Sequence, residues 1–141
     1  MKKIIFSLVL ALCTIQMDAQ NPHMRFNPER FEAEMEQFIV VQAGLSPTES
    51  AVFFPLYKEM QDKQRMLFSK KRRYHHTDTS DDKVSLEVIK DMDYIDLQMK
   101  KIQQQYHLKF CKVLPAGKVL RILKAEERFH RQAIGRVSRG Q

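Results

Sequence analysis

Apolar residues recur every three or four positions in four segments of the chain, at about 28–43, 46–73, 83–113 and 115–134. This spacing gathers apolar side chains on one face of an α-helix. No segment alternates polar and apolar residues as a half-buried strand does. The pattern therefore predicts an all-α protein of four helices. The predicted inner faces carry Phe31, Met35, Phe38, Ile39, Phe53, Leu56, Tyr57, Met60, Leu67, Phe68, Val88, Met92, Ile95, Met99, Ile102, Tyr106, Val113, Val119, Ile122, Leu123, Phe129, Ala133 and Ile134.

Residues that favour helix ends border the first two segments. Asn27 has a side chain suited to an N-cap, and Pro28 follows it at the first helical position. Gly44 is typical of the position just past a helix end. Ser46 with Glu49 three residues later has the pattern of a capping box. These signals predict that the first helix ends at Gly44 and that the second begins at once.

The polar stretch 74–82 lacks a hydrophobic period, so it is predicted to connect the second and third helices. Thr79 or Ser80 is expected to cap the third helix, helped by the negative charges of Asp81 and Asp82 near the positive end of the helix dipole. Pro115 is expected to begin the fourth helix.

The two long central helices are predicted to form an antiparallel hairpin. The apolar spacing of the third helix is close to 3.5 residues, which suits a near-antiparallel partner. Pro55 lies inside the second helix, where a missing backbone hydrogen bond predicts a bend. A weaker apolar stripe opposite the main one has two interpretations: the first or fourth helix covers it, or a second copy does in a dimer. This stripe contains Leu86, Leu97, Leu108 and Cys111.

The first nineteen residues have the layout of a secretory signal peptide. Lys2 and Lys3 precede an apolar run from Ile4 to Leu12, and Ala19 offers a small residue for cleavage. The run is too short to span a membrane. Lipid attachment at Cys13 and an uncleaved anchor are the competing interpretations, and the bulk of Leu12 disfavours lipid attachment.

Cleavage near Ala19 predicts an exported, periplasmic chain. Residues 20–26 would then form a flexible N-terminal arm and residues 27–141 a single helical domain. Cleavage changes the net charge from +7 to +6, because Lys2, Lys3 and Asp18 are removed.

Cysteine and motif content give no sign of catalysis. Cys111 is the one cysteine left after cleavage, so it is either a buried thiol or half of an intermolecular bridge. His107 lies one turn before it, but no orienting partner is evident. The chain has no glycine-rich phosphate loop, nucleophile elbow, Cys-x-x-Cys or His-Glu-x-x-His motif. We therefore expect a protein that is not an enzyme and needs no cofactor.

Two histidine-containing groups are candidate zinc or copper ligands, since imidazole and carboxylate suit these metals. His75 and His76 lie in the polar connector, where a solvated turn is the alternative interpretation. Glu126 and His130 lie one turn apart toward the apolar face of the fourth helix. They are either a mutually satisfied buried pair or half of a metal site that another helix completes.

Basic residues form two groups, and both are candidates for binding unfolded proteins. One closes the second helix and the other projects from one sector of the fourth, while a solvated surface is the alternative interpretation for both. Export argues against nucleic acid, so acidic segments of unfolded chains or anionic lipid headgroups suit the charge better. Methionine adds a flexible apolar contact. The candidate residues are Lys70, Lys71, Arg72, Arg73, Arg121, Lys124, Arg128, Arg131 and Met66.

Two helix starts carry a resemblance to a known family. Leu45-Ser46-Pro47-Thr48-Glu49, followed by Phe54-Pro55-Leu56-Tyr57, resembles the Leu-Thr-x-x-Gln motif of the Spy/CpxP family of periplasmic proteins. The segment from Leu114 and Pro115 to Lys118 occupies the place of a second copy. Serine and glutamate replace the motif's threonine and glutamine in the first copy, and proline and lysine replace them in the second.

The resemblance implies an all-α hooked hairpin that pairs as an antiparallel, cradle-shaped dimer with a basic, partly apolar concave face for clients. Members of the family include ATP-independent chaperones, inhibitors of envelope stress sensors and zinc-linked proteins. The expected function is therefore a periplasmic ATP-independent chaperone or envelope-stress accessory protein. The alternative is a sensor-type module that inhibits a membrane signalling protein or responds to metal.

Overall fold

The computed structural model describes residues 27–139, and the predicted signal peptide and N-terminal arm lie outside this range. The described residues form four α-helices and one short 3-10 helix, with no strand among them. The prediction of an all-α protein with four helices is confirmed. The elements are α1 (Pro28–Ala43), α2 (Pro47–Arg72), η1 (Arg73–His76), α3 (Asp82–Val113) and α4 (Ala116–Arg139).

Side chains cap the helices largely where the sequence places them. Asn27 Oδ1 accepts a hydrogen bond from the Arg30 backbone N–H at 3.2 Å. Gly44 has φ 65° and ψ 49°, a left-handed conformation that glycine adopts without a steric penalty. Ser46 and Glu49 form both hydrogen bonds of the capping box that opens α2. Because these bonds join residues close in sequence, the sequence was sufficient to predict them.

The cap of α3 differs from the prediction. Asp81 is the N-cap, and its Oδ1 accepts from the backbone N–H groups of Lys83 and Val84 at 2.9 and 3.1 Å. Thr79 and Ser80, the predicted caps, precede it in the turn, where the Ser80 N–H donates to Asp78 Oδ1. The carboxylate nearest the helix start therefore takes the capping role, and its charge also suits the positive end of the helix dipole.

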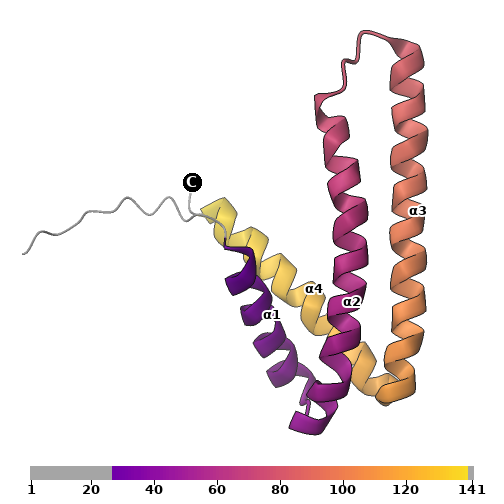
Figure 1. Ribbon diagram of the computed structural model, residues 1–141. Helices are drawn as coiled ribbons and strands as arrows, with labels where there is room; N and C mark the ends of the chain where they lie inside the picture. The colour runs from indigo at the N-terminus through magenta and orange to yellow at the C-terminus, as the bar shows by residue number, and fades with distance from the viewer. Residues whose placement is uncertain (1–26, 140–141) are drawn as a thin grey trace, which may run out of the picture.

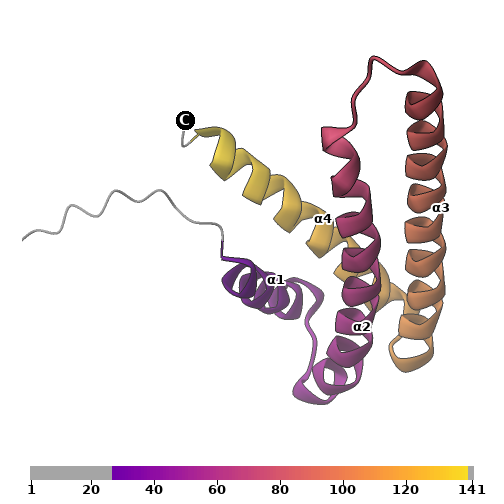
Figure 2. The ribbon, with the colours of Figure 1, turned by 45° about the horizontal axis from the view of Figure 1, so that its top comes forward.

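The helices form two pairs that diverge from a common corner (Figures 1 and 2). α2 and α3 lie side by side and run in opposite directions, joined by η1 and residues 77–81. α1 and α4 also lie side by side, and this pair leaves the corner at an angle to the first. The corner contains the α1–α2 and α3–α4 turns. We call the two pairs the α2/α3 arm and the α1/α4 arm.

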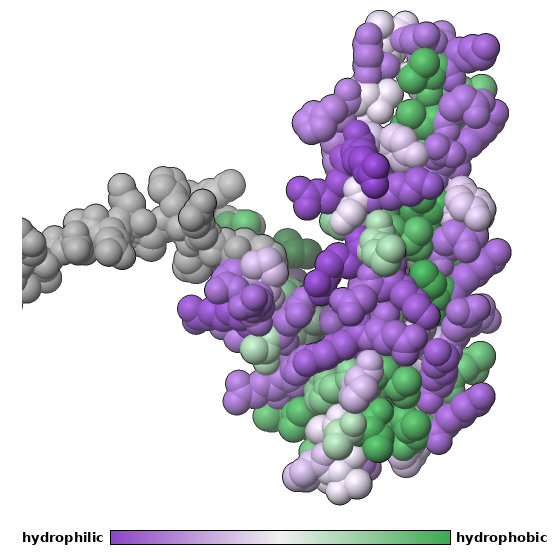
Figure 3. Space-filling view, viewed as in Figure 1, coloured by the Kyte–Doolittle hydropathy of each residue, from purple (hydrophilic) through white to green (hydrophobic). Residues whose placement is uncertain are grey.

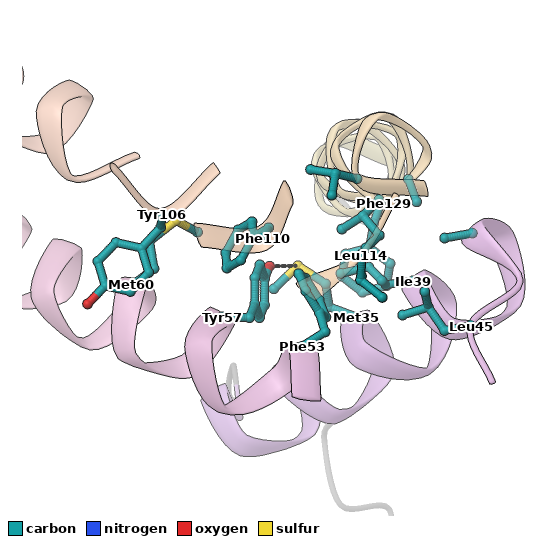
Figure 4. Packing of buried hydrophobic residues seen from close by; sticks show 14 residues of the cluster. Met35, Ile39, Leu45, Phe53, Tyr57, Met60, Tyr106, Phe110, Leu114 and Phe129 are labelled. Carbon is teal, nitrogen blue, oxygen red and sulfur yellow. Dashed lines mark hydrogen bonds between the residues drawn. The ribbon is translucent and has the colours of Figure 1, made fainter. Parts of the chain in front are cut away.

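The hydrophobic core is concentrated at the corner, where all four helices meet (Figure 4). Ile39, Phe53, Phe110 and Ile122, one from each helix, are all 0% exposed. The rings of Phe53 and Phe110 pack edge to face with their centroids 4.9 Å apart. Figure 3 shows the same distribution on the surface, with apolar side chains gathered over the corner and in a column along the α2/α3 arm. Among the described residues, Ile95 is the one buried side chain outside this cluster.

Three positions predicted to face inward are exposed: Phe68, Val113 and Ile134. Beyond Arg65, which pairs with Glu32 of α1, α2 runs beside α3 alone (Figure 1). Phe68 is therefore exposed while Leu67 is half-buried. α4 continues ten residues beyond Phe129, whose ring packs on Phe31 near the start of α1, so Ile134 extends past the end of its partner. The inward prediction is wrong at Phe68 and Ile134 because the neighbouring helix is absent or too short, and at Val113, the last residue of α3, nothing in the structure explains the exposure.

The second stripe of α3 is uncovered. Leu86, Leu97 and Leu108 are 51%, 60% and 62% exposed, and Cys111 is a free, exposed thiol. The interpretation that the first or fourth helix covers this stripe is therefore wrong, and so is the interpretation of Cys111 as a buried thiol. The three leucines are spaced by eleven residues, or close to three helical turns, so they form a straight line along α3.

Candidate client-binding surface

The half of α2 farthest from the corner exposes a methionine beside cations. Met66 is 76% exposed and lies in a shallow hollow. The hollow follows one face of the helix, because most of its lining residues are separated by three or four positions. It is lined by Asp62, Arg65, Met66, Ser69 and Arg73. A flexible thioether between two guanidinium groups suits a ligand in which apolar groups lie next to acidic groups.

Phe68 is exposed on an adjacent side of α2, the side that meets α1. Arg65 forms an ion pair there with Glu32 of α1. Phe68 and Arg72 follow Arg65 by three and seven residues, so they share that side one and two turns farther from the corner. Phe68 is 53% exposed. The opening between the two arms is thus bordered on α2 by an aromatic ring and a guanidinium group.

One member of the basic run at the end of α2 is already paired. Lys71 Nζ lies 2.7 and 2.6 Å from the two carboxylate oxygens of Asp96 on α3. Lys71 therefore joins the two helices of the arm, and a client would compete with Asp96 for its charge. Lys70, Arg72 and Arg73 remain exposed near the negative end of the helix dipole, where their charge is favoured.

The basic residues of α4 belong to the other arm (Figure 1). Arg121, Lys124, Arg128 and Arg131 are all exposed. Arg128 donates to Gln42 of α1 at 3.0 Å, and Arg131 pairs with Glu127 of its own helix at 3.2 Å. The structure therefore does not bring the predicted client-binding residues together, because one group ends the α2/α3 arm and the other lines the α1/α4 arm.

The two motif copies meet at the corner. Leu45 and Leu114 are buried there, and Lys118 forms an ion pair with Glu49. Lys118 Nζ also donates to the carbonyl oxygen of Gly44 at 3.2 Å. The hydrogen bond from Lys118 holds the pKa of Glu49 below its usual value. The lysine that departs from the motif in the second copy thus pairs with the glutamate that departs from it in the first.

This contact was not predicted, although opposite charges at equivalent positions of two related segments were visible in the sequence. The two prolines of the motif copies, Pro55 and Pro115, lie within or next to the helices predicted for them. Pro55 lies inside α2 and is exposed, and α4 begins at Ala116, one residue after the prediction. The Pro115 carbonyl accepts from the Lys118 and Val119 N–H groups at 2.9 and 3.1 Å.

Glu126 of α4 contacts Tyr57 of α2, whose ring is labelled in Figure 4. The buried Tyr57 hydroxyl donates to Glu126 Oε1 at 3.0 Å and lies 3.7 Å from Met35 Sδ. Burial and the nearby Glu126 carboxylate raise the pKa of Tyr57 above its ordinary value. His130 Nε2 is 3.9 Å from the same Glu126 oxygen, and its side chain is about half exposed. The predicted buried Glu126–His130 pair is therefore mainly a Tyr57–Glu126 pair.

The candidate metal ligands do not converge on a common point. His75 and His76 are exposed in η1 at the far end of the α2/α3 arm, whereas Glu126 and His130 belong to α4. Within residues 27–139, no three His, Cys, Asp or Glu side chains lie close enough together to hold a metal ion.

Over the same residues, no helix combines the length and apolarity needed to cross a membrane. No protein-family model matches the chain, and neither a curated protein nor a solved structure is significantly similar to it.

Proposed function

We propose that this protein is a periplasmic, ATP-independent chaperone that holds unfolded or partly folded clients on the outer half of α2. The observation that carries the proposal is the exposure of Met66 and Phe68, 76% and 53%, among the cations of the same helix. The two side chains are two residues apart and therefore project from different sides of α2. A client segment that wraps around this part of the helix would contact both of them and the cations between them.

The charges and the apolar groups would have different roles. Lys70, Arg72 and Arg73 would attract acidic segments of a client and accelerate its encounter with the surface. Met66 and Phe68 would then retain apolar segments through weak contacts, and the thioether would adapt to different side chains. Such binding needs no nucleotide, because release follows from the weakness of each contact.

The proposed active form is a cradle-shaped dimer. The uncovered line of Leu86, Leu97 and Leu108 on α3 supports it, because covering these residues with a second copy would remove apolar surface from water. A bend at Pro55 would curve the α2/α3 arm around a client. Sedimentation equilibrium of the chain from residue 20 tests the dimer, and a monomer at tens of micromolar would contradict it. The Leu97→Glu variant is expected to be a monomer at concentrations where the wild-type chain is a dimer.

Suppression of aggregation tests the chaperone. A chemically denatured client is diluted into buffer with stoichiometric protein, and light scattering is followed at low and high salt. The double variant Met66→Ser/Phe68→Ser is expected to lose most of the protection at both salt concentrations. The matched control Val41→Ser/Val52→Ser, which removes two exposed apolar residues away from the basic run, is expected to retain it.

Protection that is absent for the wild-type protein at both salt concentrations would overturn the proposed function. Equal loss in the two double variants would show that general surface apolarity, and not the α2 surface, holds the client. Protection that does not change with salt would contradict only the role of the cations in attracting the client and would leave the role of Met66 and Phe68 in place.

A further inference from the structure

The net charge of the described residues resides entirely on α4. This helix has seven lysines and arginines and two glutamates, a net charge of +5. The remaining described residues contain fourteen basic and fourteen acidic side chains, and their net charge is zero. The basic character of the folded domain is therefore a property of one helix.

The helix packed against α4 does not neutralise it. α1 contains four glutamates, but three of them pair elsewhere. Glu32 and Glu36 form ion pairs with Arg65 and Lys58 of α2, and Glu34 pairs with Arg30 of α1 itself. The α1 residue that contacts an α4 cation is the uncharged Gln42, which accepts from Arg128.

The outer side of α4 also exposes aliphatic side chains. Leu120 and Ile134 are 53% and 70% exposed. They share one helical face with Lys124, Glu127 and Arg131, because the positions 120, 124, 127, 131 and 134 are separated by four and three residues in turn. Glu127 pairs with Arg131 at 3.2 Å, so the positive charge of the face comes from its remaining cations. Arg121 and Arg128 border this face on one side. We call Leu120, Arg121, Lys124, Arg128, Arg131 and Ile134 the α4 face.

We propose that the α4 face docks lengthwise on a bilayer that contains anionic phospholipid. Its residues are spread over about 21 Å of helix, at 1.5 Å per residue, and do not converge on one point. Such a row complements a planar array of phosphates better than it complements a single acidic group. Cations with interspersed aliphatic side chains are typical of helices that lie in a membrane interface.

The docked arrangement leaves the α2 surface free. The α1/α4 arm rests on the lipid, and the α2/α3 arm leaves the corner at an angle to it, as Figures 1 and 2 show. This inference does not depend on the proposed function, since lipid binding and protection of a client are measured separately.

Vesicle flotation tests the proposal. The chain from residue 20 is used, because it contains the whole core and lacks the apolar segment near the N-terminus that would bind vesicles by itself. Vesicles contain phosphatidylcholine alone or mixed with phosphatidylglycerol. The wild-type chain is expected to float with the mixed vesicles at low salt and to be released as salt rises.

The test variant replaces Arg121, Lys124, Arg128 and Arg131 with glutamine. Each cation near an anionic surface contributes about 1 kcal/mol, or about fivefold in partition, so the loss should be on the order of several hundredfold. The matched control replaces four cations elsewhere, Lys70, Arg72, Arg73 and Lys101, and is expected to keep most of the binding. Circular dichroism and thermal unfolding establish that both variants are folded.

Two further variants separate the contributions within the α4 face. Arg121→Lys/Arg128→Lys/Arg131→Lys keeps the charge and is expected to bind like the wild-type chain. Leu120→Ser/Ile134→Ser is expected to bind at low salt but to be released at lower salt than the wild-type chain.

Equal flotation with phosphatidylcholine alone would overturn the proposal, and so would equal losses in the test variant and its control. Failure of the wild-type chain to float with mixed vesicles would overturn it as well. If poly-glutamate binds the α4 face and the mixed vesicles do not, the surface serves an acidic polypeptide and the lipid proposal is wrong.

Discussion

The corner and the far half of the α2/α3 arm are built from the same helices but differ in how many neighbours each helix has. At the corner, α2 packs within four helices, and Phe53, Tyr57 and Met60 are buried. Farther along the arm it has only α3 beside it, and Met66 and Phe68 are exposed. One amphipathic helix can therefore supply both a core and an exposed apolar surface, and the presence of further helices decides which.

Polar contacts follow the same division. At the corner, Tyr57–Glu126 and Glu49–Lys118 join residues 69 positions apart in the sequence. Along the arm, Lys71–Asp96 joins α2 to α3 and Tyr74–Asp91 joins η1 to α3, and both contacts are at least partly exposed to solvent. We expect the corner to determine whether the domain folds and the arm to contribute less to its stability.

Truncation of a large apolar side chain in each region should show the greatest difference. Phe110→Ala at the corner removes a ring that is 0% exposed and should lower the free energy of unfolding by about 4 kcal/mol. Ile95→Ala in the arm should cost about 2 kcal/mol, because fewer atoms are lost and the site can relax toward solvent. Urea unfolding measures both, and an equal or greater cost for Ile95→Ala would reverse the comparison.

Removal of a tyrosine hydroxyl should also lower the free energy of unfolding more at the corner than in the arm. Tyr57→Phe leaves the half-buried Glu126 carboxylate without its donor and should cost about 1–3 kcal/mol. The matched change Tyr74→Phe removes an exposed hydroxyl that donates to Asp91 at 2.8 Å, and should cost less than about 0.5 kcal/mol.

The Tyr57 substitution also has a signature in alkaline solution. The folded-state pKa of Tyr57 is raised above the ordinary value of 10.0, so the folded protein keeps a proton that the unfolded chain loses. The corresponding stability is fully present below pH 10 and decreases as pH rises above it. The free energy of unfolding of Tyr57→Phe should therefore fall less steeply above pH 10 than that of the wild-type chain. Parallel curves would show that this hydroxyl is not held at the corner.

The ion pair between the motif copies should show a smaller, coupled effect. Glu49→Gln keeps a capping-box side chain and Lys118→Gln keeps a donor, so each substitution removes mainly charge. Each single variant should have a lower urea midpoint than the wild-type chain, and the second substitution should lower it less than the first. Strictly additive shifts would show that the corner does not depend on this contact.

This pair also predicts behaviour in acid. Lys118 lowers the folded-state pKa of Glu49 below 4.5, so the folded protein binds fewer protons there than the unfolded chain. The stability gained is present above pH 4.5 and is lost as pH falls through the folded-state pKa. Acid unfolding of Glu49→Gln should therefore show a weaker pH dependence than that of the wild-type chain.

The smallest effect is expected for the cross-helix ion pair of the arm. Lys71→Gln breaks a pair whose side chains are 26% and 48% exposed, so its cost should be below about 1 kcal/mol. Lys70→Gln, which removes an adjacent exposed cation, serves as the control and should change the urea midpoint by less. A cost for Lys71→Gln above that of Tyr57→Phe would show that the arm, and not the corner, depends on polar contacts.

The sequence by itself determined the number of helices, the boundary between the first two and most of the corner core. These features depend on local rules: Ser46 and Glu49 are three residues apart, Gly44 needs no partner for its left-handed conformation, and apolar residues one turn apart share a face. The N-cap of α3 was misplaced because three neighbouring residues, Thr79, Ser80 and Asp81, all have suitable side chains.

Only the tertiary structure decided which apolar faces are covered and which charges meet. Hydrophobic periodicity identifies the inner face of α2 but not where its neighbours end, so Phe68 was predicted to be inside and lies in solvent. The two basic groups looked alike in the sequence, yet they belong to different arms. Lys118 met Glu49 and Glu126 met Tyr57 because long-range packing brought their helices to the corner, and such a contact follows from no local spacing.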